Sequence, residues 1–261
     1  MKTYVITGST SGIGKALLEE YSKNNIVFAG YRNENLKIEG ENIIPFYIDL
    51  TKPETITNAV SFILSKTEKV DTLINSAGCV VAGAIEYISM DEIRRQFEVN
   101  VFGGLDLAKQ INPDKILNLS SMSSFGIYPF IAPYCASKRA LDIFFNLYQL
   151  EKYNSGIKII SLKLGSVATP IWSKSIKENS KSIENAKGYE RECTYLVKNA
   201  QKNERYAKPI SSIVKTIIEI DNKPNPKPSY TIGIDAKLTE IISHLPQGLI
   251  NWLVLKKLSK K

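Results

Sequence analysis

Apolar residues follow two spacings along the chain, and each spacing predicts one kind of element. In segments such as Ala16–Tyr21 and Ile56–Ile63 they recur three and four positions apart, which places them on one face of a helix. Between such segments lie short runs of apolar and β-branched residues with the length of buried strands. Seven strands are predicted, at Tyr4–Thr7, Ile26–Ala29, Ile43–Ile48, Thr72–Asn75, Ile116–Leu119, Ile157–Leu164 and Tyr230–Ile234.

Strands and helices that alternate in this way predict a doubly wound α/β fold of the Rossmann type. The crossovers between parallel strands are right-handed, and they place helices on both faces of a seven-stranded parallel sheet. A chain of 261 residues is long enough to bury one such core. We therefore expect a single domain over residues 1–261, and we interpret the Pro-rich run at 223–228 as a connection within it.

The cysteines and the length of the apolar runs indicate the cellular compartment in which the protein is expected. The three cysteines, Cys79, Cys135 and Cys193, form no CxxC pair or Cys/His cluster, which favours reduced core thiols over disulfides or a metal site. The N-terminal residues lack the pattern of a secretory signal, and no apolar run has the length of a membrane span. We expect a soluble, cytoplasmic protein without a metal.

The formal net charge of +8 is compatible with an acidic cofactor, anionic lipid or nucleic acid. The excess of lysine lies at 174–208 and at 256–261, outside any pattern typical of a nucleic-acid-binding fold. We interpret these lysines as solvated faces and expect no nucleic-acid partner.

A glycine-rich turn follows the first predicted strand and precedes a predicted helix. Glycines there permit a tight turn and a close approach to a pyrophosphate, and the helix start presents free N–H groups. The turn predicts a dinucleotide site, although Gly8 and Gly12 are further apart than in the common G-x-G-x-x-G pattern. The residues assigned to this site are Gly8, Ser11, Gly12, Ile13 and Gly14.

The end of the second predicted strand bears on which dinucleotide is bound. A carboxylate there would hold the ribose hydroxyl of NAD, whereas a cation would accept the 2′-phosphate of NADP. The chain has Tyr31, Arg32 and Asn33 at this position, with no acid. Arg32 offers a charged fork suited to phosphate, and Ser11 could add a hydroxyl. NADP(H) is therefore the favoured cofactor, with NAD(H) as the alternative.

Tyr134 and Lys138 lie four residues apart on a helix predicted to begin near Pro133. An ammonium beside a phenol stabilises the phenolate and lowers the phenol pKa, so Tyr134 could exchange a proton with a substrate oxygen. Ser121, at the end of the fifth predicted strand, could donate to the same oxygen.

Together these residues resemble the short-chain dehydrogenase/reductase superfamily. The motifs that carry the resemblance are Thr7-Gly8-x-x-x-Gly12-Ile13-Gly14, Asn75-Ser76-Ala77-Gly78, Asn100, Ser121 and Tyr134-x-x-x-Lys138. The resemblance implies that Tyr134 is the acid/base and that Ser121 polarises the carbonyl. It also implies that Lys138 binds the nicotinamide ribose and that Asn100 holds a water linked to Lys138.

The same resemblance implies further contacts to the cofactor. Asp49 and Leu50 would contact the adenine, while Val167 and Thr169 would lie at the nicotinamide. Asn75, Ala77 and Gly78 would line the adenine ribose. The chain departs from the family's usual pattern at Ser76, where a second Asn is common, and at Leu164-Gly165, where Pro-Gly is common.

The polar stretch at about 166–208 is predicted to form a lid over the substrate. We expect the aromatic side chains of Phe125, Tyr128, Phe130 and Trp172 near the substrate. Tyr134–Leu141 and Tyr230–Lys237 resemble the hydroxysteroid and retinol dehydrogenase branch, which implies a hydrophobic ketone, aldehyde or secondary alcohol. Two alternatives stay open: a reductase of small polar or acyl-thioester ketones, and a nucleotide-binding regulatory protein without turnover.

The segment at about 235–258 combines apolar residues with lysines and is predicted to be amphipathic. It could make peripheral contact with a membrane, or it could pack over the substrate cleft. The resemblance implies a homodimer or a homotetramer, with the helix of Tyr134 and Lys138 at the interface.

Overall fold

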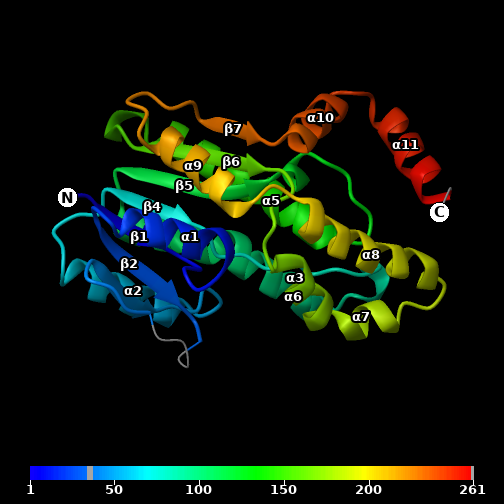
Figure 1. Ribbon diagram of the computed structural model, residues 1–261, viewed down its shortest axis with the longest axis horizontal. Helices are drawn as coiled ribbons and strands as arrows, with labels where there is room; N and C mark the ends of the chain where they lie inside the picture. Colours follow the sequence, from blue (N-terminus) through cyan, green and yellow to red (C-terminus); the bar gives the residue numbers. More distant parts are fainter. Residues whose placement is uncertain (34–37, 260–261) are drawn as a thin grey trace.

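The computed structural model describes residues 1–33 and 38–259, with the backbone alone for Lys181 and residues 201–206. The described residues form one sheet of seven parallel strands, in the order β3-β2-β1-β4-β5-β6-β7 (Figure 1). The predicted fold class is therefore confirmed. The strands are β1 Thr3–Ile6, β2 Ile26–Tyr31, β3 Ile43–Tyr47, β4 Thr72–Asn75, β5 Lys115–Ser121, β6 Lys158–Leu164 and β7 Ser229–Ile232.

Helices connect these strands and extend beyond the last of them. A π-helical turn, Glu98–Phe102, joins α3 to α4. β7 ends before the predicted Ile234 because Gly233 has a φ of 119° and α10 begins directly after it. The helices are α1 Gly12–Tyr21, α2 Pro53–Leu64, α3 Met90–Phe97, α4 Gly103–Ile111, α5 Ala132–Glu151, α6 Ile171–Glu178, α7 Ser180–Glu184, α8 Glu190–Tyr206, α9 Ile210–Asp221, α10 Ile234–Ser243 and α11 Gln247–Ser259.

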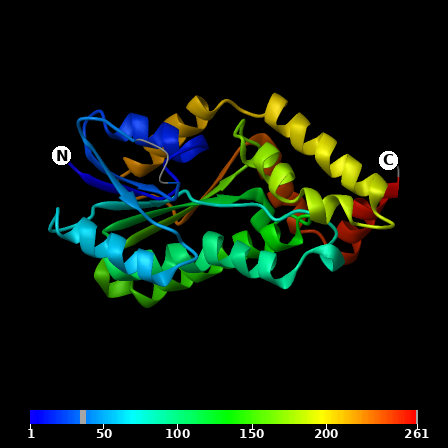
Figure 2. The ribbon, with the colours of Figure 1, turned by 90° about the horizontal axis from the view of Figure 1, so that it is seen from below.

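The sheet is covered on both faces, which explains why its strands are apolar on both sides. Figure 2 shows α1 and α9 on one side of the sheet and α2, α4 and α5 on the other. On the first side, Leu17 and Ile217 belong to one buried cluster with Tyr4. On the second, Phe145 of α5 belongs to a cluster with Val5. Successive residues of β1 thus face opposite layers.

A buried carboxylate ties the first of these layers to the sheet. The Asp221 side chain, at the end of α9, is fully buried. Its Oδ2 accepts hydrogen bonds from the hydroxyls of Tyr4 (2.9 Å) and Tyr21 (3.0 Å), and its Oδ1 lies 2.8 Å from Nζ of Lys115. One side chain therefore links β1, α1, β5 and α9.

The strand order reverses direction between β1 and β4. The chain moves outward from β1 to β3, returns to β4 on the other side of β1, and then moves outward again to β7. In open parallel sheets the ligand crevice forms at such a switch point, beyond the carboxyl ends of the strands. The loops after β1, β2, β4, β5 and β6 meet there.

The segment predicted as a lid contains the three helices α6, α7 and α8. Its two ends are held together, since Val167 and Lys208 form a parallel bridge and the Ala168 N–H donates to the Lys208 carbonyl over 3.0 Å. The segment predicted as amphipathic at 235–258 is divided into α10 and α11, with the break at 244–246. No helix within residues 1–33 and 38–259 is long and apolar enough to cross a membrane.

Candidate active site

A cleft of about 300 Å³ opens at the switch point of the sheet. Gly14, Asn75 and Asn100, which were predicted to contact the cofactor or its water, stand behind the cleft wall instead of lining it. The predicted site residues that do line it are Gly8, Ser11, Gly12, Ile13, Arg32, Asp49, Leu50, Ala77, Gly78, Ser121, Tyr134, Lys138, Val167 and Thr169.

The turn after β1 requires glycine for its backbone conformation and, at Gly8, for its close approach to Ala77. Gly8 has a φ of 66°, and a Cβ on it would lie 2.8 Å from the Ala77 Cα. Gly12, at the first position of α1, has a φ of 55°. The first N–H groups of α1 have no partner within the helix. The turn therefore leaves a backbone cradle open for an anionic group.

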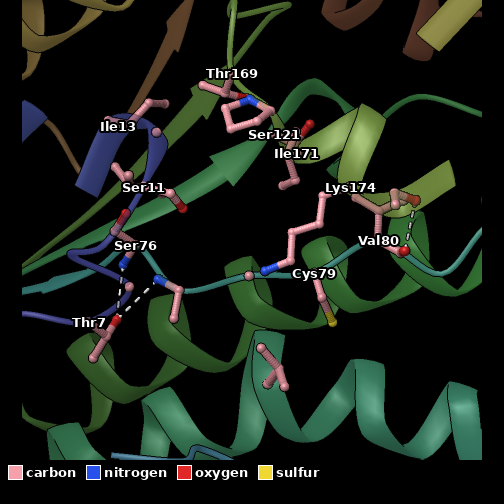
Figure 3. A pocket seen from close by; sticks show the side chains of 18 of the residues that line it. Thr7, Ser11, Ile13, Ser76, Cys79, Val80, Ser121, Thr169, Ile171 and Lys174 are labelled. Atoms are coloured by element: carbon pink, nitrogen blue, oxygen red, sulfur yellow. Dashed lines mark hydrogen bonds between the residues drawn. The ribbon is translucent and has the colours of Figure 1, made fainter. Parts of the chain in front are cut away.

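Thr7, which the sequence analysis did not assign to the site, joins this turn to the loop after β4. Its Oγ1 accepts hydrogen bonds from the N–H groups of Ser76 (3.1 Å) and Ala77 (3.2 Å), the dashed lines at Thr7 in Figure 3. The hydroxyl directly before Gly8 was the sequence signal for this role. Thr7 fixes the two loops at the spacing that the cleft requires.

Two of the predicted residues behind the wall act through packing. A Cβ on Gly14 would overlap the carbonyl of Gly8, so glycine is required for the first turn of α1 to approach the glycine turn. Asn75 is buried in β4, and its Nδ2 donates to Oδ1 of Asn118 in β5 over 2.8 Å. These side chains shape the cleft from behind.

The end of β2 presents a cation to the cleft. Arg32 is exposed and lines the cleft, whose lining carboxylates are Asp49 and Glu178. Oδ1 of Asp49 accepts from the Thr51 N–H (3.0 Å) and the Thr51 hydroxyl (2.8 Å). Asp49 is therefore held in place by its own loop, while the Arg32 guanidinium makes no hydrogen bond or ion pair with the described residues and can meet an anion.

Ser121, Tyr134 and Lys138 meet on one wall of the cleft. Tyr134 and Lys138 are buried on the same side of α5, whose first turn contains Pro133 as predicted. Nζ of Lys138 lies 5.9 Å from the centre of the Tyr134 ring and donates to the Leu119 carbonyl over 2.8 Å. The Ser121 hydroxyl lies near enough to Tyr134 to lower the pKa of its phenol. A phenol, a hydroxyl and an ammonium thus lie together on one wall of the cleft.

The pKa of Tyr134 differs from the sequence-based expectation. We expected the ammonium to lower it, but burial raises the pKa of Tyr134 to about 12 and outweighs the lowering by its hydrogen bond with Ser121. Burial also lowers the pKa of Lys138 from 10.5 to about 8. Both shifts favour the uncharged forms, because the Tyr134 phenolate and the Lys138 ammonium would lose their hydration when buried. At neutral pH Tyr134 is a proton donor beside a lysine that still carries its charge.

Asn100 supports the wall from the π-helical turn. Its Oδ1 accepts from the Cys79 N–H (2.9 Å), and its Nδ2 donates to the Cys79 carbonyl (3.1 Å) and to Oγ of Ser137 (3.0 Å). It thereby fixes the strand extension after Gly78 against the helix of Tyr134 and Lys138. π-turns of this kind are frequent at functional sites.

The first lid helix is anchored over the cleft by two buried polar side chains. Oγ of Ser175 and Nδ2 of Asn179 both donate to the Val80 carbonyl, each over 2.9 Å. Both side chains are nearly inaccessible to solvent. α6 is therefore held down on the segment that follows Gly78.

Three charged residues of the cleft were absent from the sequence-based assignments. Figure 3 shows the side chain of Lys174 extending from α6 into the cleft, where Nζ lies 3.9 Å from Oε1 of Glu178. Arg95 of α3 also lines the cleft, half-buried. Lys174 and Glu178 reach the cleft because Ser175 and Asn179 hold α6 on the Val80 carbonyl, and no motif in the sequence marks that contact.

Of the aromatic residues predicted near the substrate, Trp172 lines the cleft and packs edge-to-face on Tyr134, with ring centres 6.2 Å apart. The other three do not line the cleft. The Tyr128 hydroxyl forms a hydrogen bond with the Thr239 hydroxyl (3.1 Å), the Phe125 ring lies under Nζ of Lys163, and the Phe130 ring packs on Tyr189.

The part of the chain that the structure describes contains no group of His, Cys, Asp and Glu side chains suited to a metal.

Comparisons with known proteins connect this geometry to one family. A sequence profile of the short chain dehydrogenase family matches residues 2–180. The chain is 28% identical to the uncharacterized oxidoreductase YusZ of Bacillus subtilis, covering 100% of this chain and 98% of that protein. It is 25% identical, at the same coverage, to an NADPH-dependent 3-dehydrocapnine reductase of Ornithobacterium rhinotracheale. A short-chain dehydrogenase structure from Streptomyces avermitilis has the same fold, with a TM-score of 0.73, 19% identity, and coverage of 100% of this chain and 99% of that one.

Proposed function

This chain belongs to the short-chain dehydrogenase family, and we propose that it transfers a hydride between NADP(H) and a hydrophobic ketone, aldehyde or secondary alcohol. The chain is a dehydrogenase or reductase that acts on CH–OH or C=O groups and uses a nicotinamide dinucleotide. The convergence of Ser121, Tyr134 and Lys138 on one wall of the cleft is the observation that carries the proposal.

The cleft fits a dinucleotide by its shape and its charge. The cradle at Gly8 and Gly12 leaves space and free N–H groups for a diphosphate, and Lys138 lies where it can donate to a ribose hydroxyl. The nicotinamide ring, when bound, supplies or accepts the hydride. Asp49, Leu50, Ala77 and Gly78 would hold the adenosine half, and Ile13, Val167 and Thr169 would hold the other.

Tyr134 would exchange the proton that accompanies the hydride. In the direction of reduction its phenol donates to the substrate oxygen, while the Ser121 hydroxyl donates a second hydrogen bond to that oxygen. The Lys138 ammonium stabilises the phenolate that forms on Tyr134. Asn100 acts as a positioning residue, since its three hydrogen bonds fix the elements on which these groups stand.

Arg32 supports a preference for NADP(H) over NAD(H). A planar guanidinium can pair with the 2′-phosphate, and Tyr31, Arg32 and Asn33, the described residues at the end of β2, include no carboxylate. The relative from Ornithobacterium rhinotracheale carries an NADPH-dependent activity in its name.

Titration of the protein with NADPH and with NADH, followed by nucleotide fluorescence, tests this preference. Arg32→Ala should weaken NADPH binding roughly 10- to 100-fold, as expected for a charged hydrogen bond of about 1.5–3 kcal/mol, and leave NADH binding unchanged. Equal loss for both nucleotides would remove Arg32 from 2′-phosphate recognition. Binding of neither nucleotide would overturn the proposed enzyme.

The substrate class is proposed from the wall beyond Ser121. Val80, Ile171 and Trp172 line it together with the ring of Tyr134, which favours an apolar substrate with one polar centre. Arg95 and Lys174 favour the alternative of a small polar or acyl-thioester ketone, because both place positive charge at the cleft. Values of kcat/KM for an alkyl ketone and for a ketone of equal length with a terminal carboxylate separate the two.

A regulatory protein without turnover is the alternative from another class. Tyr134→Phe keeps the ring and removes the proton donor, so an enzyme should lose roughly 10²–10⁴-fold in rate and retain its affinity for NADPH. Unchanged activity of this variant with every carbonyl substrate would support the regulatory alternative.

The exposed face of α5 supports the proposed homodimer or homotetramer. Ile143, Phe144, Leu147 and Leu150 are between 44% and 60% exposed, and Phe102 lies edge-to-face against Phe144. An apolar stripe of this kind marks an association surface. Light scattering during size-exclusion chromatography should give a multiple of 29.2 kDa, and Leu147→Glu should reduce it.

A further inference from the structure

The last two helices leave most of their large apolar side chains in solvent. Ile250 is the only buried residue of α11, and Ala236 the only buried residue of α10. Figure 1 shows the two helices projecting beyond the end of β7 at the C-terminal end of the chain. Their exposed apolar residues are Ile234, Leu238, Ile241, Ile242, Leu245, Leu249, Trp252, Leu253 and Leu255.

The polar residues of α11 are separated from the apolar ones along the helix axis. Residues 249–255 are apolar except for Asn251, and Lys256 and Lys257 follow directly. Since successive helical residues are about 100° apart, these six apolar residues surround the helix. Packing against one flat protein face would leave the remaining sides in water.

Charge distinguishes the candidate occupants of this surface. A second copy on a two-fold axis would present the same patch, in which Lys237, Lys256 and Lys257 outnumber Asp235 and Glu240, so net positive charge would meet net positive charge. An anionic lipid surface offers the opposite charge to these lysines and an apolar layer to the leucines. Trp252, whose ring carries the Lys256 ammonium 4.6 Å from its centre, is suited to the boundary between the two.

We propose that α10 and α11 form a docking surface for membranes that contain anionic lipid, with the apolar residues of α11 inserted into the interface and Lys256 and Lys257 at the headgroups. A helix of 13 residues is about 20 Å long, which is too short to span a hydrocarbon core of about 30 Å. α11 therefore enters the headgroup region from one side. The proposal concerns attachment and does not depend on the proposed reductase activity.

The docking surface lies at the same end of the molecule as the lid. Figures 1 and 2 both place α11 at the end of the molecule where α7 and α8 lie. A membrane bound there would face the lid side of the cleft. The enzyme would then present its cleft entrance near the lipid phase.

Vesicle flotation with the full-length protein tests the proposal. Vesicles of phosphatidylcholine with phosphatidylglycerol should carry the protein upward, and phosphatidylcholine alone should carry little. Lys256→Gln/Lys257→Gln should weaken binding roughly 30-fold, at about 1 kcal/mol per lysine, and added salt should weaken wild-type binding. Trp252→Glu/Leu255→Glu should abolish it.

Two controls separate attachment from misfolding and from self-association. Ile85→Glu/Met90→Glu changes side chains of similar exposure elsewhere on the surface and should leave flotation unchanged. NADPH titration should be the same for all variants. In a Trp172→Phe background, anionic vesicles should shift the emission of Trp252 to shorter wavelength.

Failure of the wild type to float with anionic vesicles would overturn the proposal. Equal flotation with both vesicle types would overturn the role of the lysines. If wild-type protein does not float and Trp252→Glu/Leu255→Glu lowers its mass in solution, the surface is an interface between copies instead.

Discussion

The ammonium of Lys138 donates a hydrogen bond to the backbone carbonyl of Leu119, with Nζ and the oxygen 2.8 Å apart. Leu119 lies two residues before Ser121 on β5. The bond therefore fixes the helix that carries Tyr134 against the strand that carries Ser121. The relative position of the two groups at the substrate oxygen depends on it.

Replacing Lys138 should impair catalysis in two ways, because both a charge and a hydrogen bond are lost. Lys138→Met removes the ammonium beside Tyr134 and leaves the Leu119 carbonyl without its donor, so kcat should fall roughly 10²-fold or more. The neighbouring Arg139→Met, at an exposed position on α5, is the matched control and should keep wild-type kcat. Similar rates for both variants would remove Lys138 from the mechanism.

The lowered pKa of Lys138 predicts the pH dependence of reduction. Lys138 loses its proton above about pH 8, whereas Tyr134, with a pKa of about 12, remains protonated. We expect kcat/KM for reduction to fall above about pH 8, as measured in the free enzyme. A profile that stays flat to pH 10 would contradict this assignment.

The same shift has a consequence for stability with a defined sign. Between about pH 8 and 10.5 the unfolded chain holds the Lys138 proton and the folded chain does not, so the free energy of unfolding rises with pH. Lys138→Met lacks this contribution. Urea unfolding should therefore show the wild type gaining stability relative to the variant across that window.

Thr7 should affect cofactor binding through the loops it connects. Thr7→Val keeps the shape but leaves the Ala77 N–H without its acceptor, at a cost of about 1–3 kcal/mol, whereas the Ser76 N–H keeps its second acceptor, the Ile74 carbonyl. We expect weaker NADPH binding and a lower midpoint of thermal unfolding. Thr7→Ser retains the hydroxyl and should restore both, and a Ser variant as poor as Val would point to the lost methyl group instead.

The two donors to the Val80 carbonyl should control the position of α6. Ser175→Ala/Asn179→Leu removes both hydrogen bonds, so the lid should open more often and become more sensitive to limited proteolysis. KM for the substrate should rise. Lys177→Ala, on the exposed side of the same helix, is the control. Wild-type proteolysis rates in the double variant would show that apolar packing alone holds α6.

Asp221 should matter for stability and not for chemistry. Asp221→Ala leaves two tyrosine hydroxyls without their acceptor and the Lys115 ammonium with only the backbone carbonyl of residue 221, and the free energy of unfolding should fall by about 3–5 kcal/mol. The exposed pair of Lys69 and Asp114 should contribute far less, because solvent screens it. Denaturant unfolding of Asp221→Ala and Lys69→Ala measures the difference.

The sequence predicted the sheet because its strands are buried on both faces, as Ile116 and Leu117 show by facing opposite clusters. Gly8 and Ser121, which it assigned to the site, line the cleft because the carboxyl ends of parallel strands meet at one edge, and Tyr134 lines it from the first turn of α5. These predictions rest on periodicity and local motifs.

What the sequence could not predict depends on contacts between distant segments. Lys174 reaches the cleft because α6 is held on the Val80 carbonyl, and Arg95 lines the cleft from α3, far away in the sequence. The raised pKa of Tyr134 follows from burial that spacing does not reveal. The hydrogen bonds of Asn100 to the backbone of Cys79 also join distant segments, and its predicted contact with a water stays a prediction.

The partners of Asp221 also determine when, during synthesis, the N-terminal part of the protein can complete its packing. Tyr4 and Tyr21 leave the ribosome about two hundred residues before Asp221 does, so β1 and α1 cannot complete their buried hydrogen bonds while the chain is growing. A nascent chain that collapsed around them earlier would enclose two unpaired hydroxyls. The N-terminal half, although it holds the glycine turn, therefore reaches its final packing only after α9 has emerged.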